Sequence, residues 1–168
     1  MDNPERPLGR IIILNGTSSS GKSSIASELK QILPGSFCYY ASDQLAEAGF
    51  RANVATSDGR VRFFDGFHRS IASFALSGND LIVEHIVEQQ VWADDLNTIL
   101  APFDTFWVGI HCDLETLKNR EIRRGDRSLG EALFHLKTHD FCRYDFEVTN
   151  EQTANTAAYA IKAAWDLR

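Results

Sequence analysis

Short apolar runs alternate with longer amphipathic stretches along most of the chain. Five runs have the length of a β-strand and cover residues 11–14, 37–41, 81–83, 105–110 and 144–148. Several of them are apolar at successive positions, as in Ile11-Ile12-Ile13-Leu14, rather than at alternate ones. Runs of this kind are typical of strands that are buried on both faces of a parallel sheet. The pattern therefore predicts five strands, most of them buried.

The stretches between these runs have the spacing of α-helices. Apolar residues at 25, 29, 32 and 33 follow the helical period and Pro34-Gly35 ends the segment, so we expect a helix over 24–33. Further helices are expected over 43–50, 64–76, 87–100, 114–123, 129–138 and 153–167, and a polar loop over 53–59. About five β-α repeats predict a three-layer α/β fold, in which helices cover both faces of a five-stranded parallel sheet.

Length and composition fit one globular domain. The chain has 168 residues, of which 43% are hydrophobic and 24% are charged. It contains no internal repeat or linker, so we expect a single domain over 1–168. The formal net charge of -6 argues against a bulk affinity for nucleic acid or for an anionic membrane. No apolar run approaches the roughly 20 residues that a membrane-spanning helix needs.

The N-terminal residues and the cysteines indicate a cytoplasmic protein. Residues 1–6 lack the basic and apolar segments of a secretory signal. Cys38, Cys112 and Cys142 are scattered and form no CxxC pair, which is typical of reduced thiols. We expect Cys38 and Cys112 to lie in the core. The sequence does not indicate an oligomeric state.

A phosphate-binding motif directly follows the first apolar run. Residues 16–23, GTSSSGKS, match the pattern G-x-x-x-x-G-K-[ST], with an expected strand before them and an expected helix after them. The glycines let backbone N–H groups point at phosphate oxygens, and the helix adds its positive N-terminal end. Lys22 would reach the β- and γ-phosphates, and the Ser23 hydroxyl would bind Mg²⁺. We therefore predict an ATP site formed by Gly16, Thr17, Ser18, Ser19, Ser20, Gly21, Lys22, Ser23 and Ser24.

A phosphate loop alone does not distinguish a switch, a motor and a kinase. The chain resembles small-molecule kinases in size, and such kinases also need an acceptor-side base, a metal-side carboxylate and mobile arginines. Asp43 follows the run 37–41, at the sheet edge where ligands bind in open α/β folds, and is our candidate base. The alternative interpretation is a helix N-cap made by Ser42 and Asp43.

Glu84 and His85 follow the apolar run 81–83 at the corresponding sheet edge. Glu84 is a candidate metal-side carboxylate that would hold Mg²⁺ through water, and a polar strand end is the alternative. A packed histidine is the favoured interpretation of His85. His135 and His139 lie one helical turn apart without the glutamate of an HExxH motif, so a structural role is favoured over metal binding.

Four arginines lie within eight residues around Gly125-Asp126: Arg120, Arg123, Arg124 and Arg127. One interpretation is a solvated helix end, where cations are favourable. The other is a lid over about 120–130, because guanidinium groups bind phosphate in a bidentate manner. We expect at least one of them, Arg120 among the candidates, to contact the nucleotide.

Several segments together resemble the chloramphenicol phosphotransferase-like kinases: IIILNGTSSSGKSSI, ASDQL, FWVGIHCDLETLKNREIRRGDR and YDFEV. The resemblance runs from about residue 11 to 150. It implies a P-loop kinase fold and ATP-dependent phosphorylation of a small-molecule hydroxyl. It also implies that Asp43 is the catalytic base and that Arg124 and Arg127 serve the lid in catalysis. Glu84-His85 stands where the family tends to show paired aspartates, and residues 51–69 show little likeness.

The leading hypothesis is an ATP- and Mg²⁺-dependent phosphotransferase that acts on a hydroxyl of a small molecule, such as an antibiotic. One alternative is a kinase for a nucleotide sugar or another metabolite, as in the toxin-like P-loop kinases. The other is a nucleotide-gated binding module that transfers nothing. Neither nucleic acid nor a membrane is expected as a partner.

Overall fold

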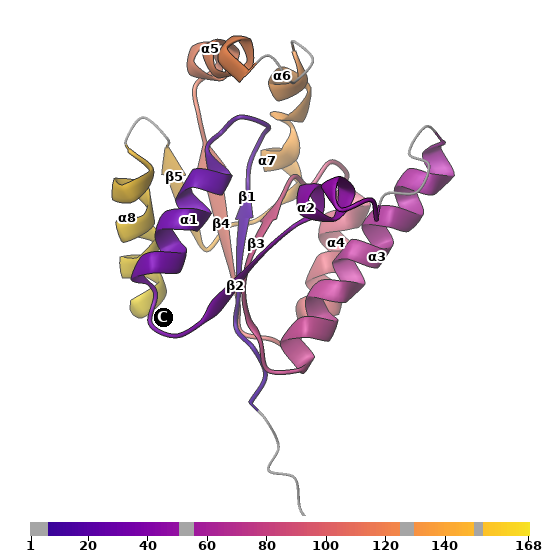
Figure 1. Ribbon diagram of the computed structural model, residues 1–168, viewed down its shortest axis with the longest axis vertical. Helices are drawn as coiled ribbons and strands as arrows, with labels where there is room; N and C mark the ends of the chain where they lie inside the picture. Colours follow the sequence, from indigo (N-terminus) through magenta and orange to yellow (C-terminus); the bar gives the residue numbers. More distant parts are fainter. Residues whose placement is uncertain (1–6, 51–55, 125–129, 150–152) are drawn as a thin grey trace, which may run out of the picture.

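The computed structural model describes residues 7–50, 56–124, 130–149 and 153–168, with only the backbone of Arg124. Its centre is a sheet of five parallel strands in the order β2-β3-β1-β4-β5 (Figure 1). The strands are β1 (Ile11–Asn15), β2 (Phe37–Ala41), β3 (Asp80–His85), β4 (Thr105–His111) and β5 (Phe146–Thr149). The five predicted strands and their parallel arrangement are confirmed.

Helices cover both faces of the sheet, which confirms the three-layer fold. α1 (Lys22–Ile32) and α8 (Ala154–Asp166) pack on one face, and α3 (Ser57–Leu76) and α4 (Gln90–Leu100) pack on the other (Figure 1). The remaining helices lie beyond the carboxyl ends of the strands (Figure 1). They are α2 (Ser42–Glu47), α5 (Leu114–Arg124), α6 (Glu131–His135) and α7 (Thr138–Phe141).

Strand β1 explains why the apolar runs are continuous. Ile12 and Leu14 belong to the core cluster under α1 and α8, whereas Ile11 and Ile13 belong to the cluster under α3 and α4. All four side chains are at most 1% exposed. Because successive side chains of a strand point to opposite faces, a strand covered on both faces needs an apolar residue at every position.

The register of the strands brings the predicted site residues to one edge of the sheet. Asn15 of β1 lies opposite His85 of β3, and Ala41 of β2 lies opposite Glu84. The phosphate loop therefore leaves the sheet beside Glu84-His85, and Asp43 follows Ala41 at the same level. This edge is where ligands bind in open parallel sheets.

Three expectations about local structure are wrong. Residues 57–59 are not a loop but the first turn of α3, whose N-cap Thr56 accepts a hydrogen bond from the Gly59 N–H at 3.1 Å. Within 129–138 the described residues do not form one helix, since α6 ends at His135 and α7 begins at Thr138. Cys38 is exposed and Cys112 is half-buried, so neither lies in the core.

In the described parts of the chain, no helix is long and apolar enough to cross a membrane.

Candidate active site

The phosphate loop after β1 depends on glycine at both ends. A Cβ atom at position 16 would lie 2.5 Å from the backbone oxygen of Ile110, so only glycine fits against β4 here. Gly21, the N-cap of α1, has φ 96°, and Ser19 has φ 62°. A left-handed serine is uncommon, and such strained residues cluster at ligand-binding sites. The Ser19 hydroxyl is also buried without a hydrogen-bond partner, as suits a loop that is completed by a ligand.

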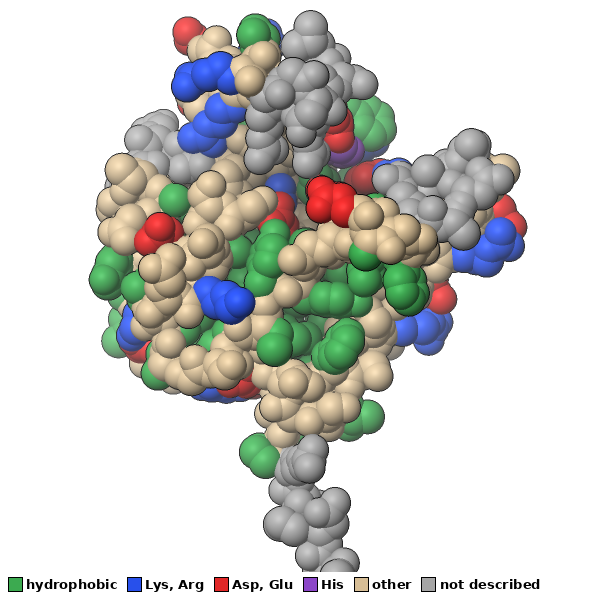
Figure 2. Space-filling view, viewed as in Figure 1, with side chains coloured by type: hydrophobic (Ala, Val, Ile, Leu, Met, Phe, Trp, Pro, Cys, Tyr) green, Lys and Arg blue, Asp and Glu red, His purple; other side chains and the backbone are tan. Residues whose placement is uncertain are grey.

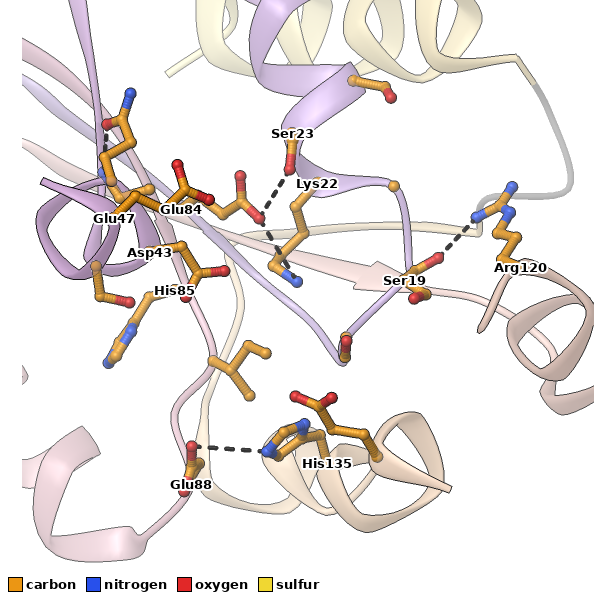
Figure 3. A pocket seen from close by; sticks show the side chains of 18 of the residues that line it. Ser19, Lys22, Ser23, Asp43, Glu47, Glu84, His85, Glu88, Arg120 and His135 are labelled. Carbon is orange, nitrogen blue, oxygen red and sulfur yellow. Dashed lines mark hydrogen bonds and ion pairs between the residues drawn. The ribbon is translucent and has the colours of Figure 1, made fainter. Parts of the chain in front are cut away.

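Lys22 and Ser23 converge on Glu84 from the start of α1 (Figure 3). The Lys22 ammonium donates to the backbone oxygen of Thr17 at 2.8 Å and lies 3.9 Å from Glu84 Oε1. The Ser23 hydroxyl donates to the same carboxylate oxygen at 3.1 Å. The structure thus brings together the lysine, the serine and the metal-side carboxylate that the sequence suggested. A hydroxyl beside a carboxylate is a donor set that suits Mg²⁺.

Tyr39 also contacts Glu84 and was missed by the sequence analysis. Its phenol donates to Glu84 Oε2, and burial together with this hydrogen bond raises the pKa of Tyr39. The tyrosine therefore stays protonated and holds Glu84 from the side of β2. The only sequence signal was its place in a strand that ends at the ligand-binding edge.

A cavity of about 1110 Å³ lies over the carboxyl ends of the strands. Its lining includes Lys22 and Ser23 from the phosphate loop and α1, and Asp43 from α2. Asp43 lies in the first turn of α2, whose N-cap is Ala41, and the N–H of Ala41 is bound by the Gln44 side chain at 3.1 Å. The N-cap interpretation of Ser42 and Asp43 is therefore wrong. The carboxylate of Asp43 belongs to the same cavity as Lys22 (Figure 3).

The other predicted nucleotide-binding residues divide into two groups. Ser18, Ser19, Gly21 and Ser24 line the cavity together with Lys22 and Ser23. The described lining does not include Gly16, Thr17 or Ser20. Thr17 is buried, and its hydroxyl donates to the backbone oxygen of Ala132 at 2.6 Å, so this side chain fastens the loop to α6 instead.

The arginines of α5 approach the cavity from above the phosphate loop. Figure 2 shows basic side chains gathered on this helix at the top of the molecule. Arg120 donates to the backbone oxygen of Ser19 at 3.1 Å, and Arg120 and Arg123 both line the cavity. The side chain of Arg124 and the whole of Arg127 lie outside the described residues. Of the four candidate arginines, the structure thus brings Arg120 and Arg123 to the cavity.

An ion pair on the far side of the cavity was not predicted. The Arg60 guanidinium donates to both carboxylate oxygens of Glu88, at 2.5 and 2.6 Å, and lies 5.0 Å from the ring centre of Phe64. Burial alone would raise the pKa of Glu88, but hydrogen bonds from His135 and Arg60 leave this pKa below its ordinary value. Glu88 is therefore a fixed carboxylate, and Arg60, Phe64, Glu88 and His135 all line the cavity.

His85 is a buried, neutral histidine, as the sequence analysis favoured. Its Nε2 lies 2.9 Å from Nε2 of His68, inside a cluster with Phe64, Phe67 and Trp92. Burial, together with the nearby His68 and Lys22, lowers the pKa of His85 well below its ordinary value. The pair therefore packs without charge, with His85 in the cavity wall and His68 behind it.

His135 and His139 do not share a site. His135 lies beside Glu88, whereas the ring of His139 stacks on His111 with ring centres 3.9 Å apart and lies 2.8 Å from the Tyr144 hydroxyl. Over the described residues, no group of three histidine, cysteine or acidic side chains is placed to hold a metal ion. A structural role fits His139, whereas His135 lines the cavity.

Residues 9–166 match the model of a protein family described as chloramphenicol phosphotransferase-like protein. The chain belongs to this family. The match covers nearly the whole chain and confirms the resemblance that the sequence segments indicated. As a member of the chloramphenicol phosphotransferase-like family, the protein is a phosphotransferase of the P-loop kinase class.

Relatives and solved structures agree with this placement. The candidate O-phosphotransferase Rv2636 of Mycobacterium tuberculosis is 26% identical over 175 residues, which cover 88% of this chain and 77% of the relative. The M. tuberculosis APS kinase CysC, solved with AMPPNP and APS, has a TM-score of 0.74 at 18% identity and covers 95% of this chain and 99% of its own. The Deinococcus radiodurans tunicamycin resistance protein has a TM-score of 0.67 at 18% identity, and the match covers 92% of this chain and 94% of that protein's chain. At these identities the two structures support the fold alone.

Proposed function

We propose that this family member transfers the γ-phosphoryl group of ATP to a hydroxyl group of a small molecule. One observation supports the proposal most. A single cavity is lined on one side by the phosphate-binding residues Lys22 and Ser23, and on the other by the carboxylate of Asp43. A protein that only binds nucleotide has no need for an acceptor-side base in the same cavity.

The phosphate-loop side would hold the triphosphate. The backbone N–H groups of the loop and the start of α1 suit phosphate oxygens, and the Lys22 ammonium is already inside the loop. Ser23, with Glu84 behind it, would hold Mg²⁺. Held there, Mg²⁺ would supply positive charge that offsets the negative charge of the transferred group.

Asp43 would act on the acceptor. The acceptor oxygen attacks the γ-phosphorus, the bond from this phosphorus to the bridging oxygen breaks, and ADP leaves. Asp43 takes the hydroxyl proton as the new O–P bond forms. The role of Asp43 rests on its place in the cavity and on the family resemblance.

The arginines would cover the transferring group. Arg120 and Arg123 line the cavity, and we extend this role to Arg124 and Arg127 on the basis of the family resemblance. Binding of the triphosphate should order the segment 120–130 and exclude water from the reaction. Hydrogen exchange measured with and without a non-hydrolysable ATP analogue tests this prediction. Slower exchange with the analogue is expected, and equal exchange in both states would remove the lid from the mechanism.

Phosphoryl transfer from radiolabelled ATP to a panel of alcohols tests the function itself. Chloramphenicol, which the family name suggests, belongs in the panel beside sugars, nucleotide sugars and simple alcohols. We expect transfer to at least one member, dependent on Mg²⁺ and abolished by Lys22→Ala. If ATP binds but no compound is phosphorylated, the nucleotide-gated binding module becomes the better hypothesis. Because the substrate is ATP, we also propose that the enzyme works in the cytoplasm.

A further inference from the structure

The part of the cavity lining that lies outside the phosphate loop, α1 and α5, here called the acceptor half, carries several carboxylates. Besides Asp43, its described lining includes the carboxylates of Glu47, Glu88 and Glu131. The basic group described on this side, the Arg60 guanidinium, is bound to both oxygens of Glu88. Such a surface favours a ligand that brings hydrogen-bond donors rather than further anionic groups.

His135 places an additional polar atom in this half of the cavity. The side chain extends from α6, is 8% exposed, and has its ring directed into the cavity (Figure 3). Its Nδ1 is buried and has no hydrogen-bond partner. Buried polar atoms in folded proteins nearly always have a partner, so an orphan in a cavity wall indicates a ligand contact.

The other ring nitrogen determines what Nδ1 can bind. His135 Nε2 lies 3.6 Å from Oε1 of Glu88, a carboxylate that Arg60 keeps fixed (Figure 3). A carboxylate favours the tautomer in which the facing nitrogen carries the hydrogen. In this tautomer Nδ1 has a lone pair and only accepts hydrogen bonds. A ligand group that contacts Nδ1 of this tautomer is a donor.

We propose that His135 Nδ1 accepts a hydrogen bond from a second hydroxyl group of the acceptor, which is therefore a polyol such as a sugar or a cyclitol. This inference rests on the proposed function, because it concerns the acceptor half of the same cavity. A phosphate or a carboxylate has no hydrogen to give to Nδ1 and would lie among the carboxylates of the lining. The rings of Phe64 and Phe134, which also line the cavity, offer apolar surface to the carbon face of a sugar ring.

Two substitutions separate acceptor recognition from a structural role of His135. In His135→Asn the amide lies near the position of Nδ1, so it can still accept from the ligand but no longer reaches Glu88. In His135→Gln the amide lies near the position of Nε2, so it still reaches Glu88 but leaves nothing at Nδ1. If His135 only supports Glu88, glutamine should replace it better. If His135 binds the acceptor, asparagine should replace it better.

The experiment measures transfer from ATP to a panel of hexoses and cyclitols, with simple alcohols and sugar phosphates for comparison. We expect transfer to polyols, and for the best polyol a KM about 10-fold higher in His135→Gln, with a much smaller rise in His135→Asn. The affinity for ATP should be the same in both variants. An analogue of this polyol that lacks the second hydroxyl should have a similarly raised KM with the unsubstituted protein.

Several outcomes would overturn the inference. Preferential transfer to a sugar phosphate, a nucleotide sugar or a simple alcohol would do so while leaving the kinase function intact. A KM restored by glutamine but not by asparagine would assign His135 a structural role. Binding of ATP without transfer to any compound would instead contradict the proposed function. Calorimetry can also measure the affinity of the polyol for the Asp43→Asn variant in the presence of an ATP analogue. This measurement does not depend on turnover.

Discussion

At the scale of single residues, Glu84 connects the parts of the site. It accepts hydrogen bonds from Ser23 on α1 and from Tyr39 on β2, and its Oε1 lies 3.9 Å from the Lys22 ammonium. One carboxylate therefore positions the lysine and serine of the phosphate loop and fixes them to the neighbouring strands. Residues that orient metal-binding groups typically contribute a large part of metal affinity.

Glu84→Gln should therefore weaken the binding of Mg²⁺ more than the binding of ATP. The amide keeps the hydrogen-bonding shape but removes the charge that balances the metal, so we expect the Mg²⁺ concentration for half-maximal activity to rise about 10- to 100-fold. Titration of activity with Mg²⁺ at saturating ATP measures this. Glu28→Gln on α1 is the matched control, because Glu28 is a half-buried carboxylate that does not line the cavity. A half-maximal concentration unchanged from that control would exclude Glu84 from the metal side.

Asp43→Asn tests the base. General-base assistance typically contributes about 10²–10⁴-fold, so turnover with the true acceptor should fall by about this factor. The affinity for ATP should stay nearly unchanged, because the proposed role of Asp43 is to act on the acceptor. Asp166→Asn on α8 is the control for loss of a carboxylate elsewhere. Full turnover in Asp43→Asn would show that another group takes the proton.

Residues that belong to a sequence motif could be predicted, whereas residues whose role depends on contacts between distant elements could not. Lys22 and Ser23 were predictable because their motif occurs between a strand and a helix. Arg60, Glu88 and Tyr39 have no motif, and their roles depend on which elements meet across the cavity. Arg60 was also hidden because it falls between the polar loop expected over 53–59 and the helix expected over 64–76, whereas α3 already begins at Ser57.

At the scale of elements, α5, α6 and the phosphate loop are held together by a few buried contacts. Glu121 of α5 is 2% exposed and accepts from the backbone N–H groups of Gly130 and Ala132, at 3.2 and 2.6 Å. Ala132 in turn accepts from the Thr17 hydroxyl. α6 also carries His135 to the acceptor half. Through these contacts, a movement of α5 would be transmitted both to the phosphate loop and to His135.

Glu121→Gln should loosen this connection. The amide can accept at one oxygen only, so one of the two backbone donors loses its partner, at a cost of about 1–3 kcal/mol. We expect a lower Tm and faster hydrogen exchange across 130–135. Glu115→Gln, an exposed residue of the same helix, should change neither. If the two variants behave alike, Glu121 does not hold α6 to α5.

At the scale of the whole molecule, the fold was predictable because the residues of a strand indicate whether one or both of its faces are buried. Continuous apolar runs indicated a sheet covered on both faces, and the two core clusters on either side of β1 are the physical counterpart. The break between α6 and α7 was not predictable, because it depends on how both helices pack over the ends of β1 and β4. On the other side of the molecule, the packing of α3 and α4 against β3 buries two histidines, His68 and His85.

This buried pair should make the stability of the protein depend on pH. Burial lowers the pKa of His68 to about 4, with partial opposition from Asp65 and Asp95, and the pKa of His85 shifts in the same direction. An unfolded histidine has a pKa of about 6.5. As pH falls from about 6.5 to about 4, the unfolded chain takes up protons that the folded protein does not bind. The free energy of unfolding should therefore be largest above pH 6.5 and decrease across this range.

His68→Gln removes the contribution of one member of the pair. The glutamine amide can still donate to His85 Nε2 but does not titrate, so the loss of Tm between pH 7 and pH 4 should be smaller than in the unsubstituted protein. It should not vanish, because two other histidines stay in place: His85, whose pKa is also lowered by burial, and His139, whose pKa burial lowers to about 4. Thermal unfolding at half-unit steps of pH measures the difference. Parallel curves for the two proteins would mean that His68 is protonated as readily in the folded state as in the unfolded chain, and that the aromatic cluster around it admits the charge.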